Sequence, residues 1–153
     1  MILDEVEDPS GRDHGEKGEI FKHGRPNKIV PDYSADGTMK SIEDSLKRMK
    51  IDHIDFVWVH DIAQDFYGDR WLALFETART AAFRALSKLR DEGVIKSWGL
   101  GVNKVEPVKL LLALSEADPD ATLLADRYTL LDHEIALHRG PLQLRRTHRP
   151  ASV

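Results

Sequence analysis

The residues best suited to chemistry are His60 and Asp61, which end a short apolar run. Residues 54–59 read Ile-Asp-Phe-Val-Trp-Val, and such β-branched and aromatic runs are typical of strands buried on both faces of a parallel sheet. In α/β enzymes the reacting groups follow the C-terminal ends of such strands. A histidine there can hydrogen-bond a substrate or move a proton, or it can simply bond a neighbouring backbone group. Asp61 is predicted either to orient His60 or contact substrate, or to be a solvated carboxylate.

Further candidate residues follow this strand. Trp71, with Phe66 and Tyr67, lies in a predicted loop over residues 62–72. Aromatic side chains in this place line a substrate pocket or serve ordinary packing. The seven histidines have no HExxH or other ligand spacing, so no metal site is predicted. A glycine-rich phosphate loop of the Rossmann or P-loop type is also lacking.

The elements that must position these residues alternate between helix and strand. A helix begins near Asp36 or Thr38, either of which can cap it, and leads into the strand with His60. A second helix over residues 74–92 ends at Gly93, a position that favours glycine. Residues 94–102 form a strand followed by Asn103, Glu106-Pro107 starts a third helix, and residues 121–124 form a third strand. This order predicts right-handed βαβ units and a parallel sheet.

The two ends of the chain do not follow this pattern. Residues 1–35 are predicted to be a loop or leader, because most of them are rich in Gly, Pro, Asp and His without periodicity. Residues 36–135 carry the helix–strand units. Residues 136–153 are basic and lack an apolar period, so we expect a disordered tail.

Composition excludes several classes of function. The formal net charge of −4 gives no basis for binding nucleic acid or an anionic membrane surface. No apolar run approaches the ~18 residues that cross a bilayer, and the first residues do not resemble a signal peptide. The absence of cysteine suits a reducing cytoplasm.

Residues 41–61, 86–103 and 123–132 together resemble the aldo-keto reductases. Residues 41–49 followed by 54–61 resemble the helix and fourth barrel strand of that family, and residues 86–103 are similar to the next helix and strand. Residues 123–132, LLADRYTLLD, most resemble the branch that oxidises L-fucose, D-threo-aldoses or pyridoxal. The resemblance covers roughly residues 30–135. It implies an α/β fold, a partial (β/α)₈ TIM barrel of about three consecutive βα units with parallel strands.

The resemblance also implies a reaction and site residues. The expected reaction is hydride transfer between NAD or NADP and a small carbonyl or sugar substrate. His60 would be catalytic by bonding the substrate oxygen, and Asn103 would hold the nicotinamide carboxamide, its alternative being to cap the next helix. Asp61 and Trp71 are the candidate substrate-binding residues.

The family's catalytic Asp, Tyr and Lys have no counterpart in this sequence. We therefore expect a truncated enzyme, weak or inactive, and a gene fragment whose reading frame is lost near residues 133–137. The alternative function is a non-catalytic fragment or a half-barrel that associates with itself through its exposed sheet edges.

Overall fold

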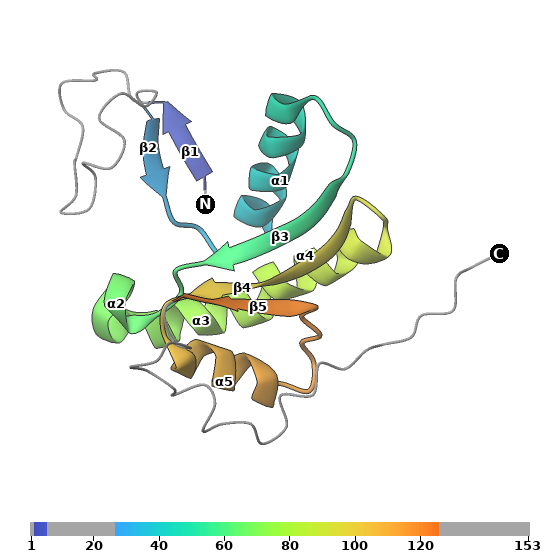
Figure 1. Cartoon of the computed structure of the whole chain (residues 1–153). Coiled ribbons are helices and arrows are strands. Elements are labelled where there is room, and N and C mark those ends of the chain that lie inside the picture. The colour runs from blue at the N-terminus through green and yellow to red at the C-terminus, as the bar shows by residue number, and fades with distance from the viewer. Residues whose placement is uncertain (1, 6–26, 126–153) are drawn as a thin grey trace.

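Three parallel strands form the centre of the molecule (Figure 1). The computed structural model describes residues 2–5 and 27–125. Strands β3 (Ile54–His60), β4 (Ile95–Val102) and β5 (Ala121–Leu124) form one sheet in the order β3-β4-β5, with parallel pairing throughout. The prediction of three consecutive βα units with parallel strands is confirmed.

The register brings the C-terminal ends of these strands together. His60 lies opposite Gly101, and Gly101 lies opposite Leu123. Residues that follow each strand are therefore neighbours at one end of the sheet, where parallel α/β folds place their functional groups.

A helix precedes each strand. Helix α1 (Ala35–Met49) leads into β3, α4 (Ala82–Asp91) into β4, and α5 (Val105–Ala113) into β5. Helices α4 and α5 both pack against β4, and α1 packs against α4. This repeats one helix–strand unit three times along the chain.

The structure corrects the start of the first helix. Its N-cap is Ser34, whose hydroxyl accepts a 3.0 Å hydrogen bond from the Gly37 N–H, and neither Asp36 nor Thr38 takes that place. The nearby Asp32 carboxylate accepts from the Ser34 N–H at 2.8 Å. The hydrogen bond from the Ser34 backbone, followed by one from its side chain, holds the pKa of Asp32 below its usual value.

The segment between β3 and β4 is more helical than predicted. Residues 62–72, predicted to be a loop, contain α2 (Gln64–Tyr67) and the 3₁₀ turn η3 (Gly68–Arg70). The single helix predicted over 74–92 is two, α3 (Trp71–Thr80) and α4, separated at Ala81. Gly93 has a φ of +78° just beyond α4, as its place at a helix C-terminus predicts.

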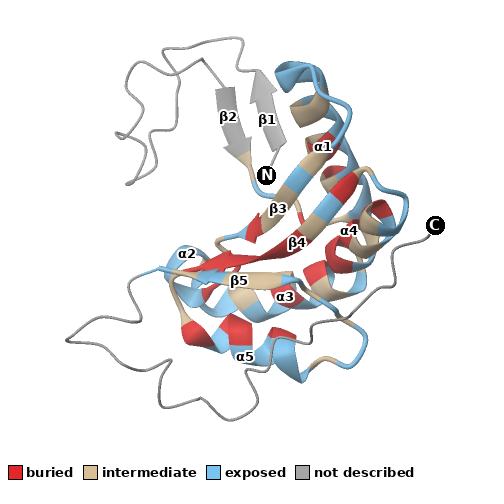
Figure 2. Cartoon of the chain, turned by 45° about the vertical axis from the view of Figure 1, so that its right-hand side comes forward, coloured by how far each residue is buried: buried red, intermediate tan, exposed pale blue. Residues whose placement is uncertain are grey.

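The hydrophobic core lies between β4 and the helices (Figure 2). Trp98 and Leu100 of β4 are fully buried beside Phe83 and Leu86 of α4, and the rings of Phe83 and Trp98 stack at 5.2 Å. In β3, by contrast, Val59 is the one buried residue. The expectation that β3 is buried on both faces is wrong, because it is an edge strand of this sheet and β4 is the central one.

Strand β5 is held in place by a polar cluster at its start. The Asp120 carboxylate accepts hydrogen bonds from the Trp98 N–H at 3.0 Å and from the Arg90 guanidinium at 2.9 Å. Arg90 also pairs with the carboxylate of Asp118. The turn before β5 is thus fixed to both β4 and α4.

The prediction that residues 1–35 form a loop or leader is wrong in part. Strands β1 (Ile2–Glu5) and β2 (Asn27–Val30) pair in antiparallel fashion, with Ile2 opposite Val30. Short, isolated pairs of this kind leave little periodic signal in a sequence. Residues 6–26 and the predicted tail 136–153 lie outside the described residues. Within the described part of the chain, no helix has the length and apolar character needed to cross a membrane.

Candidate active site

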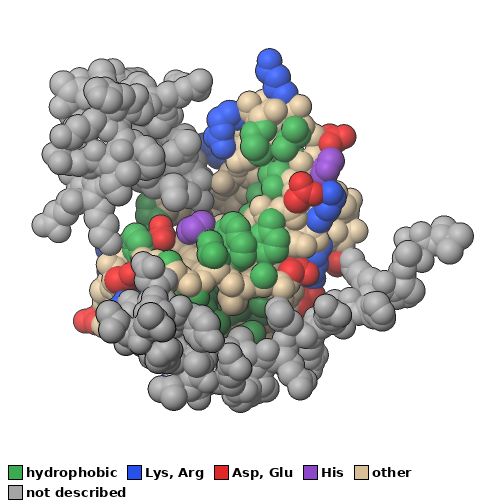
Figure 3. Space-filling model, viewed as in Figure 1, with side chains coloured by type: hydrophobic (Ala, Val, Ile, Leu, Met, Phe, Trp, Pro, Cys, Tyr) green, Lys and Arg blue, Asp and Glu red, His purple; other side chains and the backbone are tan. Residues whose placement is uncertain are grey.

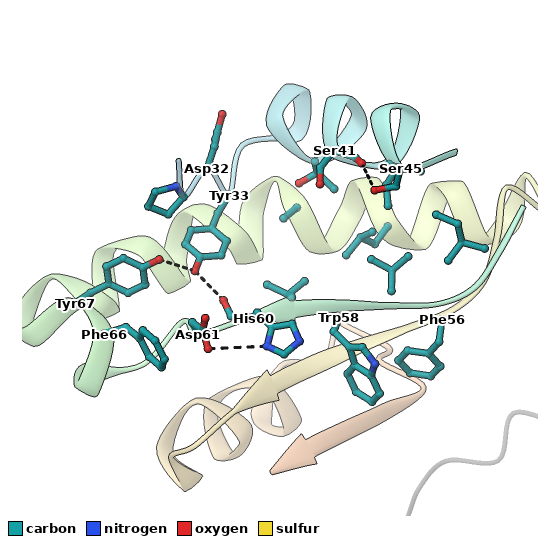
Figure 4. A pocket seen from close by; sticks show the side chains of 18 of the residues that line it. Asp32, Tyr33, Ser41, Ser45, Phe56, Trp58, His60, Asp61, Phe66 and Tyr67 are labelled. Carbon is teal, nitrogen blue, oxygen red and sulfur yellow. Dashed lines mark hydrogen bonds and ion pairs between the residues drawn. The ribbon is translucent and has the colours of Figure 1, made fainter. Parts of the chain in front are cut away.

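His60 is the last residue of β3 and its side chain is 48% exposed. Figure 4 shows Phe56, Trp58 and His60 on one side of β3, and Tyr33, Ser41 and Ser45 on the other. The space-filling view shows a histidine beside a hydrophobic patch on the face of the molecule seen in Figure 3. The predicted placement of His60 at the C-terminal end of a parallel strand matches the structure.

Glycines in β4 make room for the side chains of β3. A Cβ built on Gly101 would lie 2.9 Å from Cε1 of His60, and one built on Gly99 would lie 2.9 Å from the Trp58 ring. The imidazole of His60 therefore lies directly over the backbone of β4. A glycine inside a strand often marks such a close approach, so Gly-Leu-Gly in the predicted strand was the available signal for this contact.

Asp61 turns the chain away from the sheet immediately after His60. Its φ is +64°, and its N–H donates to the Gly101 carbonyl at 3.0 Å. Its carboxylate lies 3.9 Å from Nδ1 of His60. That separation is too long for a hydrogen bond, and it places the carboxylate on the Nδ1 side of the ring.

Tyr33 fixes the end of β3 from the side opposite the imidazole. Its hydroxyl donates to the backbone carbonyl of His60 at 2.8 Å and lies 3.1 Å from the hydroxyl of Tyr67. Since the proton of Tyr33 is used on that carbonyl, Tyr67 is the donor between the two phenols. Burial, then the hydrogen bond with Tyr67, raises the pKa of Tyr33 well above its ordinary value, so it stays a neutral phenol. The sequence gives no local signal for this contact, because the two residues lie 27 positions apart.

A cavity of about 570 Å³ follows β3 from its first residue to His60. It lies between α1 and β3, takes side chains from both faces of the strand, and reaches the aromatic residues of α2. Its lining at the end near His60 is Asp32, Tyr33, His60, Asp61, Phe66 and Tyr67. The cavity joins a hydrogen-bonding imidazole to a largely aromatic wall, which suits a small organic ligand with a polar centre.

Asn103 and Trp71 do not line this cavity in the structure. Asn103 follows β4 at the same end of the sheet as His60, and its Nδ2 donates to the Asp65 carboxylate at 3.3 Å. The N-cap residue of α5 is Lys104, so the alternative reading of Asn103 as that cap is wrong. Trp71 begins α3 and packs edge-on against Phe75, with ring centroids 6.3 Å apart, as a packing residue would.

Across the described ranges 2–5 and 27–125, no three His, Cys, Asp or Glu side chains cluster as metal ligands would. The polar groups near His60 are instead two carboxylates, two phenols and, beyond the next strand, the amide of Asn103. These groups can bind and orient a carbonyl or hydroxyl compound through hydrogen bonds.

The parallel sheet, with a helix before each of its strands, makes this an α/β protein. The family model described as "Aldo/keto reductase family" matches residues 15–138. The chain belongs to the aldo/keto reductase family.

Two curated relatives are similar to part of the chain. The chain is 48% identical over 107 residues to pyridoxal 4-dehydrogenase of Microbacterium luteolum, a match that covers 67% of this chain and 30% of the relative. It is 38% identical over 105 residues to D-threo-aldose 1-dehydrogenase of a Pseudomonas species, with 69% and 29% covered. The chain thus spans about 30% of the length of these curated relatives.

Solved structures are also similar. A crystal structure of a putative aldo-keto reductase from Pseudomonas aeruginosa matches with a TM-score of 0.45 and 36% identity, over 60% of this chain and 32% of that one. An aldo-keto reductase from Bacillus halodurans matches with a TM-score of 0.48 and 21% identity, over 71% and 34%.

Proposed function

We propose that this chain carries the histidine-bearing part of an NAD- or NADP-dependent oxidoreductase site. The proposed substrate is an aldehyde or a sugar hemiacetal, of the kind that the names of its relatives specify, pyridoxal or a D-threo-aldose. The observation that carries the proposal is the half-exposed imidazole of His60, which lines the cavity at the C-terminal end of β3.

His60 acts in this proposal by hydrogen-bonding the substrate oxygen. A donor aimed at a carbonyl oxygen stabilises the negative charge that develops there when hydride is added to the carbon. In this proposal the Asp61 carboxylate, 3.9 Å from Nδ1, orients the imidazole ring. The aromatic wall formed by Phe66 and Tyr67 then packs against the body of the substrate.

One residue at the same end of the sheet as His60 has a side chain that fits a nicotinamide. Asn103 lies at the end of the strand next to β3, and its amide matches the donor and acceptor of a carboxamide. Its Nδ2 carries two hydrogens, and one of them is donated to Asp65. A bound nicotinamide would supply or accept the hydride.

Turnover by the chain alone is expected to be weak or absent. Proton transfer to the substrate needs an acid beside His60, and the proton of Tyr33 is donated to the His60 backbone carbonyl. Tyr67 in turn donates to Tyr33, and a relay that ends on a carbonyl cannot move a proton onward. The cytoplasm is the proposed compartment, since a chain without cysteine suits a reducing environment.

The test is NAD(P)-linked turnover by the purified chain, followed by absorbance with pyridoxal or L-fucose for oxidation and a reactive aldehyde for reduction. His60→Ala is compared with His53→Ala, whose exposed imidazole bonds Asp52 away from the cavity. Binding of NADP and of pyridoxal is measured in parallel by isothermal titration calorimetry. Binding that His60→Ala weakens and His53→Ala does not supports the proposed site. Binding that neither substitution changes contradicts it.

A second candidate function is binding without catalysis. It is supported by the hydroxyls of Tyr33 and Tyr67, whose protons are both used in hydrogen bonds within the protein. If the chain binds substrate but never turns it over, even at high enzyme concentration, neither Tyr33 nor Tyr67 supplies a proton to the substrate. Turnover that His60→Ala abolishes would show that another acid completes the site.

A further inference from the structure

The outer edge of β3, which faces away from β4, has no strand beside it among the described residues. The N–H of Asp61 points to β4, where it bonds the Gly101 carbonyl. Because backbone groups alternate between the two edges of a strand, those of Phe56, Trp58 and His60 point to the outer edge. The His60 carbonyl is taken by Tyr33. Phe56 and Trp58 therefore offer backbone donors and acceptors with which an added strand can pair.

A groove runs beside this outer edge, beneath α1. It is the part of the cavity bounded by Ile42 and Ser45 of α1, by Val57 and Val59 of β3, and by Leu86 of α4; we call it the α1–β3 groove. The Ser45 hydroxyl donates to the Ser41 carbonyl of its own helix at 2.8 Å, so it places no unsatisfied donor in the groove. The groove can accept small or apolar side chains from an added strand.

The packing of the other helices indicates what fills such a groove. Helix α4, which precedes β4, brings Leu86 to the cavity wall shared with Val57 and Val59 of the neighbouring β3. Helix α5, which precedes β5, packs on the neighbouring β4. Helix α4 packs mainly on its own strand β4 but reaches the strand before it through Leu86, as α5 does on β4. By the same arrangement, α1 covers the place of a parallel strand beside β3.

Strand β5 has an outer edge and side chains that fit this place beside β3. The N–H of Ala125 bonds the Val102 carbonyl on β4, so alternation turns the backbone groups of Thr122 toward the outer edge of β5. Thr122 and Leu124 lie opposite Leu100 and Val102, whose side chains are buried in the core. The side chains of Thr122 and Leu124 are therefore on the helix side of the sheet, and both are half-buried.

We propose that β5 of one copy pairs in parallel with the outer edge of β3 of a second copy. The side chains of Thr122 and Leu124 enter the α1–β3 groove of that copy. The outward-pointing backbone groups of Trp58 form hydrogen bonds with the backbone of Thr122. The contact is head-to-tail, so it extends into chains of copies unless the rotation closes a ring. A symmetric β3–β3 contact is disfavoured, because both α1 helices would have to cover the same pair of strands. The contact involves four residues of β5, which makes it weak and dependent on concentration.

Two complementary blocking variants test the direction of the contact. Thr122→Pro removes an N–H at the outer edge of β5, where proline is tolerated, and Ser45→Trp fills the α1–β3 groove. The proposal expects each variant to sediment as a monomer at concentrations where the unmodified chain associates. An equimolar mixture of the two should form a one-to-one dimer and nothing larger. The Thr122→Pro chain keeps its groove and the Ser45→Trp chain keeps its β5, so the two can pair once and no further contact is possible.

Cross-linking gives an independent measurement because the chain has no cysteine of its own. Ser45→Cys and Thr122→Cys chains of different mass are mixed with a short bismaleimide. Products should join the two variants and should not join either to itself, while Glu43→Cys, on the exposed side of the same helix, serves as the control for Ser45→Cys. Cross-linking of Ser45→Cys to itself would indicate the symmetric contact and overturn the proposal. A chain that is monomeric at all concentrations, with no cross-linked product, would overturn it as well.

Discussion

The imidazole of His60 lies over Gly101, so closely that a Cβ at position 101 would be 2.9 Å from Cε1 and 3.1 Å from Nδ1 of the ring. These two residues are opposite each other in the parallel register of β3 and β4. The site therefore depends on a residue with no functional group of its own. Gly101 sets the height of His60 above the sheet and its distance from Asp61.

Gly101→Ala is expected to displace His60 while the sheet remains folded. The added methyl group meets a side chain that can rotate, so the free energy of unfolding should fall by about 1–3 kcal/mol, as for overpacking elsewhere. The NMR signals of the His60 ring should shift, and ligand binding at the cavity should weaken as in His60→Ala. An unchanged His60 spectrum would contradict the close packing.

Gly99→Ala provides the matched comparison, because the same methyl group meets backbone there. A Cβ on Gly99 would lie 2.1 Å from the Ala121 carbonyl oxygen of β5, which cannot move without breaking the β4–β5 pairing. We expect Gly99→Ala to be clearly more destabilising than Gly101→Ala in urea unfolding. Equal stability of the two variants would show that β5 is not held where the structure places it.

Tyr33→Phe is expected to loosen the end of β3. The change removes the donor to the His60 carbonyl and the acceptor for Tyr67, and leaves the carbonyl without its partner. A lost hydrogen bond at a buried site typically costs about 1–3 kcal/mol. Hydrogen exchange should therefore quicken at the Asp61 amide, next to the released carbonyl. Tyr67→Phe is the control, since it leaves the bond from Tyr33 to His60 intact and should have the smaller effect.

Trp98 should tolerate loss of its polar atom better than loss of its ring. It is fully buried and stacks on Phe83, yet its Nε1 has no hydrogen-bond partner among the described residues. Trp98→Ala should cost about 3–5 kcal/mol, as truncations of large core aromatics do. Trp98→Phe should cost much less, because it removes an unsatisfied buried donor along with part of the ring. Equal losses of stability would indicate that Nε1 has a partner after all.

The elements that carry the site could be predicted because their signals are local. The apolar run before His60 and the glycine at Gly93 identify a strand and a helix end from neighbouring residues alone. Other features have no such signal. Ala81 separates α3 from α4, although alanine is the best helix former, and Tyr33 meets His60 across 27 positions of the chain. Tertiary packing decides both, so periodicity could not reveal them.

The carboxylate of Asp32 is expected to make stability depend on acid pH. Hydrogen bonds from Ser34 hold its folded-state pKa below the usual 3.8, so the charged form favours folding. This contribution is fully present above the unfolded-state pKa and is lost as the pH falls through the lower, folded-state pKa. Asp32→Asn should therefore be less stable than the unmodified chain at pH 7, and the difference should shrink by pH 3. Urea unfolding of both chains at pH 7, 5 and 3 measures it, and all other carboxylates cancel in the comparison. A difference that is the same at pH 7 and pH 3 would show that Asp32 acts through its shape and not through its charge.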